Sequence, residues 1–147
     1  MESLTELTQI FQISENYIFR RLICDLPTNS LNKIYLMLHK EIIRYDGSSD
    51  QYLEKYKCAM LSKRERARFP DDEEFAQAFS TKPLYHLKGK NRHYLFERLE
   101  NHGTIENKAV WDHIEQGEYS VEHIMPQHLT SAWVEALGKN YAEIHDT

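Results

Sequence analysis

The sequence has 147 residues, of which 41% are hydrophobic and 28% are charged, and its formal net charge is −5. Five glycines and four prolines are too few for the many turns of an all-β sandwich, so a mainly helical domain is expected. No stretch approaches the roughly 18 apolar residues that cross a bilayer, and MESLTELTQIF does not resemble a secretory signal. We therefore expect no membrane partner.

Three helices are predicted before residue 44. Apolar residues recur at helical spacing over 4–11, and Ser14 is a candidate N-cap for a second helix that ends before Pro27. The third helix has the strongest periodicity, with apolar residues at three- and four-residue steps: Leu31, Ile34, Tyr35, Leu38 and Ile42.

The next three helices are predicted between residues 51 and 100. Residues 45–50 have the composition of a loop, and a helix follows over 51–61. Pro70 and the acidic residues after it are typical of a helix start, because carboxylates suit the positive end of the helix dipole. A further helix is expected over 91–100.

The pattern changes after residue 100. Residues 101–117 show little periodicity and are interpreted as an irregular connection. The segment EYSVEHIMP alternates apolar and polar side chains up to Pro126, which predicts one short strand. A last helix is expected over 131–137, with Thr130 or Ser131 as its cap and Gly138 as its end. We therefore place a helical domain at 1–100 and a small mixed segment at 101–147.

The candidate chemistry lies in the strand segment, at Glu122 and His123. A neutral imidazole can remove a proton from an attacking water, and a carboxylate is a hard oxygen ligand for Mg²⁺ or a similar cation. Such a cation stabilises charge on a scissile phosphate. An acid–histidine pair at the end of a strand, shortly before a proline, is the arrangement with which HNH (His-Me finger) nucleases open.

The run VEHIMPQHLTSAWVEALGKNYAEIH resembles the opening of the C-terminal nuclease domain of GmrSD-type type IV restriction endonucleases. The stretches FRRLICDLPTNSLNKIYLMLHKEI, FPDDEEFAQAF and RHYLFERLE resemble the helical region before that domain. The resemblance implies that His123 is the general base, that Glu122 is a metal ligand, and that Pro126 and Gln127 form the turn after the strand.

The resemblance also sets the expected fold class and partners. It implies a bundle of about six helices followed by an incomplete ββα-metal (HNH-like) segment with one or two short strands. The family continues through a second strand and a helix that complete the metal site. We therefore expect no metal bound to this chain and no cleavage by it alone. The implied partners are modified DNA and a ParB/sulfiredoxin-like NTPase domain or subunit, in defence against phage.

Two basic runs are the candidate DNA contacts, because an acidic chain can bind phosphates only through clustered cations. They comprise Lys63, Arg64, Arg66 and Arg68 in the first run and Lys88, Lys90 and Arg92 in the second. The adjacent Arg20 and Arg21 are interpreted as a solvated or ion-paired pair of which at most one faces the core.

Two other functions remain open. The chain could be a non-catalytic helical interaction module, or a metal-binding regulatory domain that uses His123 and His128. The second lacks the four compact ligands that zinc usually takes. Cys24 and Cys58 have no C-x-x-C spacing and are expected to be reduced, which favours a cytoplasmic protein.

Overall fold

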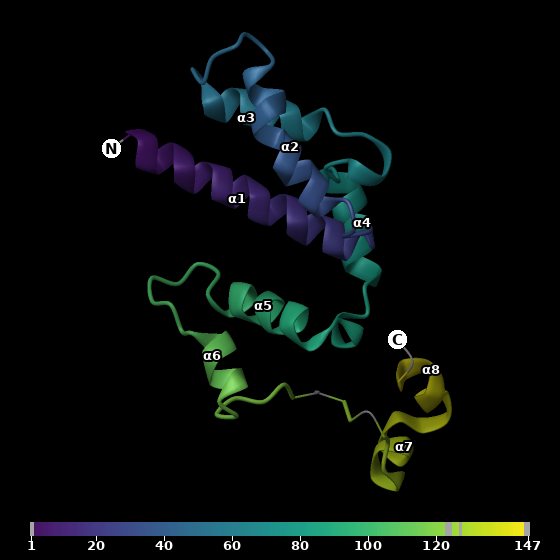
Figure 1. The fold of residues 1–147 in the computed structure, drawn as a ribbon. Coiled ribbons are helices and arrows are strands. Elements are labelled where there is room, and N and C mark those ends of the chain that lie inside the picture. Colours follow the sequence, from purple (N-terminus) through teal and green to yellow (C-terminus); the bar gives the residue numbers. More distant parts are fainter. Residues whose placement is uncertain (1, 123–124, 127, 146–147) are drawn as a thin grey trace. The chain divides into compact units, whose positions relative to one another are not determined.

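The computed structural model describes residues 2–122, 125–126 and 128–145 (Figure 1). These residues form eight α-helices and three short 3-10 helices, which confirms the mainly helical fold class. Their contacts divide the chain into two compact units, Met1–Pro83 and Leu84–Thr147. The predicted start of a nuclease segment at residue 101 stays a prediction. No helix in the described ranges is both long and apolar enough to cross a membrane.

The first unit contains α1 (Glu2–Ile23), α2 (Leu31–Ile43), α3 (Tyr52–Leu61), the 3-10 helix η1 (Glu65–Ala67) and α4 (Asp72–Thr81). Its core lies between α1, α2 and α3, and the periodic positions of α2 point into it, as predicted. The buried side chains of this core are Tyr17, Ile34, Leu38, Ile42, Tyr56, Ala59 and Met60. Burying their apolar surface is the main favourable contribution to the stability of the unit.

The first two predicted helices are one continuous helix, α1, so the prediction of an N-cap at Ser14 is wrong. The Ser14 hydroxyl instead donates to the carbonyl of Ile10, 2.8 Å away, and lies 2.6 Å from the hydroxyl of Tyr56. A serine that bonds back to the preceding turn satisfies its hydroxyl without ending the helix. The bond to α3 adds a polar contact at the edge of the core.

Arg21 is fully buried, with 1% of its surface exposed, whereas the side chain of its neighbour Arg20 is 17% exposed and pairs with Asp72 at 2.5 Å. The Arg21 guanidinium donates to the carbonyls of Arg66 and Pro27, at 2.7 and 2.5 Å. Buried cations need such partners, because they have lost their hydration. Arg21 therefore ties α1 to the connection that follows it and to η1, which is distant in the sequence.

The second unit contains η2 (Leu84–His86), α5 (Gly89–Glu100), α6 (Val110–Glu115), α7 (Ser131–Leu137), η3 (Gly138–Asn140) and α8 (Tyr141–His145). The prediction for 131–137 is confirmed, and Gly138 follows with a φ of +73°, a backbone conformation that favours glycine. Helix α6 lies inside the segment interpreted as irregular, so that interpretation was wrong. Helix α8 was not predicted.

The predicted strand is also corrected. The described residues of its segment, 118–122 and 125–126, form no strand. A strand needs a neighbouring backbone to accept and donate its hydrogen bonds. Here the N–H groups of Glu118 and Tyr119 are instead bonded to the carbonyl of His113, in the preceding helix. An alternating sequence pattern predicts an extended segment with one buried face. It does not indicate whether a neighbouring strand is present to pair with that segment.

Candidate functional site

Glu122 lies at the end of an extended segment that leaves helix α6. The helix closes with Gly117 at a φ of +75°, and the N–H groups of Glu118 and Tyr119 donate to the His113 carbonyl at 2.9 and 3.1 Å. The N–H of Gly117 donates to Ile114 at 3.1 Å, which completes a Schellman-type helix end. This turn sets the direction in which residues 118–122 leave the helix.

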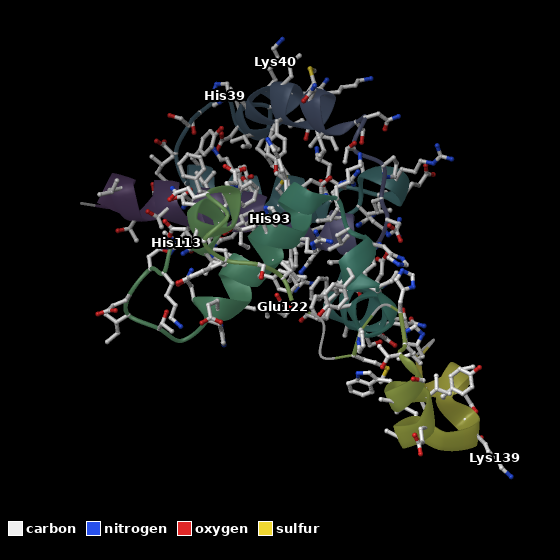
Figure 2. The ribbon with its side chains drawn as sticks, turned by 90° about the horizontal axis from the view of Figure 1, so that it is seen from below. His39, Lys40, His93, His113, Glu122 and Lys139 are labelled. Carbon is white, nitrogen blue, oxygen red and sulfur yellow. The ribbon has the colours of Figure 1, made fainter. Side chains whose placement is uncertain are left out.

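The His113 side chain contacts the same segment. Its Nδ1 lies 2.5 Å from Oε2 of Glu118, and its ring lies against that of Tyr119 with 4.8 Å between centroids. Figure 2 shows His113 on α6 and Glu122 on the segment that follows it. One histidine therefore contacts the first two residues of the extended segment through both its backbone and its ring.

The carboxylate of Glu122 is exposed. Its Oε1 accepts a hydrogen bond of 2.8 Å from the Ser120 hydroxyl, and its backbone carbonyl lies 3.4 Å from the hydroxyl of Tyr85. Within the described ranges no hydrogen bond to Oε2 is formed. One oxygen is thus oriented by a neighbour, while the other accepts no hydrogen bond from the residues that the structure describes.

Glu122 also lines a pocket of about 660 Å³ within the second unit. Its wall is largely apolar, with polar groups from Glu100, Lys108 and Ser120. Glu100 and Lys108 form an ion pair of 2.5 Å, and this carboxylate raises the pKa of Lys108. The volume lies within the range of small-ligand sites, which is about 300 to 1,000 Å³. The other lining residues are Tyr85, Phe96, Leu99, Val110, Ile114, Tyr119 and Val121.

The predicted general base, His123, lies outside the described residues, as does Gln127 of the predicted turn. Beyond His123, Pro126 is half-buried, and its carbonyl lies 3.0 Å from Nε2 of His145 in α8. Pro126 is therefore tied to the last helix. No motif or periodic pattern in the sequence predicts this contact.

The predicted metal ligand Glu122 lies among the described residues. Among the described residues, no group of three or more His, Cys, Asp or Glu could hold a metal ion. Glu122 fits one position of a Mg²⁺ site, because its carboxylate is exposed and has an oxygen available. His128 of the alternative zinc pair is exposed, and its proposed partner His123 is outside the described ranges.

The first basic run surrounds η1 and is largely engaged with neighbouring groups. Lys63 pairs with Glu41 on α2, and Arg68 forms a two-pronged pair with Glu74 on α4. Glu74 raises the pKa of Arg68 through these hydrogen bonds. Arg64 donates to the carbonyl of Leu61 at 3.2 Å, and the Arg66 side chain is exposed.

The second basic run lies at the start of α5. Lys88 and Lys90 are exposed, whereas Arg92 is half-buried and donates to the carbonyl of Tyr85 at 2.9 Å. Arg92 thus stabilises the connection between η2 and α5. Of the seven predicted contacts, three are exposed cations whose side chains form neither an ion pair nor a hydrogen bond within the described ranges: Arg66, Lys88 and Lys90.

One comparison with known proteins identifies a family. The family model of the C-terminal domain of the GmrSD restriction endonucleases matches residues 69–147. This range runs from α4 to the end of the chain and includes Glu122 and its pocket. No curated protein and no solved structure matches the chain.

Proposed function

This chain belongs to the family of the GmrSD restriction endonucleases, and we propose that it carries a metal-dependent centre for DNA phosphodiester hydrolysis at Glu122 and His123. The observation that carries the proposal is the position of Glu122. Its carboxylate is exposed beside a pocket, inside the range that the family model matches. Glu122 is assigned as a metal ligand and His123 as the general base.

The chemistry of the two side chains supports these roles. When bound, a divalent cation neutralises the phosphate and stabilises charge on the leaving oxygen. Glu122 supplies one hard oxygen ligand, and the hydroxyl of Ser120 orients its carboxylate through the 2.8 Å hydrogen bond. The imidazole of His123 accepts the proton of the attacking water, a task suited to a group that titrates near neutral pH.

The proposed substrate is modified DNA, and the proposed partner is a ParB/sulfiredoxin-like NTPase domain or subunit in phage defence in the cytoplasm. These assignments follow from the resemblance to type IV enzymes. Arg66, Lys88 and Lys90 are proposed phosphate contacts, because their cations are exposed and form no ion pair in the described ranges. Each such contact releases counterions, so we expect DNA binding to weaken as the salt concentration rises.

The test is cleavage of modified DNA by the protein that carries this chain, with Mg²⁺ or Mn²⁺ supplied. His123→Ala should reduce cleavage at least about 100-fold, because general base catalysis contributes roughly 10²- to 10⁴-fold. Glu122→Gln should raise the metal concentration needed for half-maximal activity. His128→Ala is the matched control, since it removes an exposed histidine five residues away.

Cleavage that survives His123→Ala would refute the assigned role. If the unaltered protein cuts no DNA with any divalent metal, the alternative of a non-catalytic helical interaction module is favoured instead. Metal analysis after dialysis tests the third hypothesis, a metal-binding regulatory domain. Zinc binding by His123 and His128 predicts about one equivalent of zinc that stays bound to the protein.

A further inference from the structure

Two histidines outside the Glu122–His123 pair contact the backbone on either side of it. We propose that His113 and His145 are positioning residues, which hold the described backbone before and after His123, at residues 118–119 and at Pro126, and thereby orient the Glu122–His123 pair for metal and phosphate. This inference rests on the proposed function. It adds two residues that touch neither metal nor substrate and act through the segment between them.

His113 anchors the segment before Glu122. Its carbonyl accepts the N–H groups of Glu118 and Tyr119, at 2.9 and 3.1 Å, and its ring contacts both of their side chains. An ionised carboxylate only accepts hydrogen bonds, so Nδ1 of His113 must carry the proton that it shares with Glu118. The ring is thereby fixed in one orientation, with Tyr119 against its face.

The distance from this anchor to the proposed metal ligand is short. Tyr119 precedes Glu122 by three residues, and an extended chain rises about 3.3 Å per residue, so the separation is roughly 10 Å. Among the described residues, the further contacts of Glu122 are its bond from Ser120 and the long contact with Tyr85. A change in the direction of the chain at Tyr119 is therefore transmitted to the Glu122 carboxylate.

His145 anchors the segment after His123. Its Nε2 lies 3.0 Å from the carbonyl of Pro126, three residues beyond His123. A carbonyl only accepts hydrogen bonds, so Nε2 of His145 must be the donor. Proline has no N–H group, and its carbonyl is the one backbone group through which Pro126 can be hydrogen-bonded. The contact ties this residue to α8.

The two histidines use different ring nitrogens, and this difference provides the test. The amide nitrogen of asparagine occupies the position of Nδ1, and that of glutamine reaches the position of Nε2. His113→Asn and His145→Gln thus keep each donor in place, whereas His113→Gln and His145→Asn displace it. The matched and the displaced variants differ by one methylene at each position.

With modified DNA as the substrate, the displaced variants should lower kcat by about 10- to 100-fold and raise the metal concentration for half-maximal activity. This is the usual effect of losing a residue that orients a metal ligand. The matched variants should stay within about threefold of the unaltered enzyme. The KM for DNA should not change in any of the four. Glu118→Ala should reproduce the effect of His113→Gln, and Glu115→Ala, at an exposed position of α6, is its control.

A second measurement needs no activity. In the ¹⁵N NMR spectrum of this chain at neutral pH, we expect a protonated Nδ1 at His113 and a protonated Nε2 at His145. Finding the opposite neutral tautomer at either residue would overturn its assignment. Equal activity of matched and displaced variants, in an enzyme that still requires His123, would overturn the positioning role.

Equal loss in His145→Gln and His145→Asn would also refute positioning by His145 through its Nε2 atom. Failure of the proposed function is recognised separately, because the unaltered protein then cuts no DNA or cleavage persists in His123→Ala. The two hypotheses are therefore distinguished by different variants.

Discussion

The two units of the chain differ in what holds them together. In Met1–Pro83, three helices bury a shared apolar core and a fully buried arginine. In Leu84–Thr147, the buried residues within the described ranges are Leu95 and Val110, and the candidate site is held by hydrogen bonds and a helix end. Regions with few buried contacts open at a lower free energy than packed cores. Stability and proposed chemistry therefore lie in different parts of the chain.

The largest expected effect comes from a substitution that leaves a cavity in the core of the first unit. Ile42→Ala removes a side chain with no exposed surface and should lower the free energy of unfolding of that unit by about 3 to 4 kcal/mol. Leu36→Ala, on the same helix but 77% exposed, should change it by less than about 0.5 kcal/mol. Urea unfolding followed by circular dichroism measures both, and equal effects would contradict the assigned core.

The next test uses the adjacent arginines. Arg21→Ala leaves the carbonyls of Arg66 and Pro27 without their donor in a buried place and should cost about 3 kcal/mol. Arg20→Ala removes an ion pair whose partner Asp72 is 93% exposed and a hydrogen bond to the carbonyl of Pro70, and it should cost less, about 1 to 2 kcal/mol. Thermal unfolding measures the difference. A larger loss in Arg20→Ala would show that the burial of the two side chains is reversed.

The arginine pair also shows what the sequence could predict. Helices with strong periodicity can be predicted from the sequence, because the spacing of apolar positions such as Ile34, Leu38 and Ile42 identifies the buried face without knowledge of the rest of the chain. Sequence could not decide which arginine is buried. The acceptors of Arg21 come from Pro27 and Arg66, and only the folded chain brings them together.

The same limit applies to the candidate site. The Glu122–His123 pair was recognised from its local motif, and the family match over residues 69–147 agrees with the resemblance on which it rests. The contacts of His113 depend on the turn at Gly117, which reverses the chain onto the ring. The six-residue helix α6 is too short to show a periodic pattern. The expected strand failed because pairing depends on residues distant in the sequence.

Alkaline pH should lower the free energy of unfolding of the first unit, because its tyrosines Tyr17, Tyr35 and Tyr56 are buried or half-buried. Burial raises the pKa of Tyr35, which packs against the core, to about 12, and burial also raises the pKa values of Tyr17 and Tyr56. Because the folded state disfavours the tyrosinate, stability is complete below pH 10 and is lost as the pH rises toward about 12. The loss from Tyr35 should be on the order of 1 to 2 kcal/mol.

Unfolding at pH 11, with tyrosinate absorbance as a second signal, measures this loss. Tyr35→Phe removes the ionisable hydroxyl and should shift the alkaline transition to higher pH. Tyr45→Phe, at a position that is 60% exposed, is the matched control. An unchanged transition in Tyr35→Phe would show that another group governs the alkaline unfolding.

The smallest expected change in stability concerns the N-caps of two helices, one from each unit. The carboxylate of Asp71 accepts the N–H of Glu74 at 2.8 Å, a true N-cap for α4, and Asp71→Ala should cost about 1 kcal/mol. Asp71→Asn keeps the acceptor and should restore most of it. Thr130 occupies the equivalent position before α7 but makes no such bond, so Thr130→Ala should be nearly neutral. Calorimetry measures all three, and a cost at Thr130 equal to that at Asp71 would mean that α7 is capped in solution. The second unit would then owe more of its stability to local polar contacts, and the contrast between the units would sharpen.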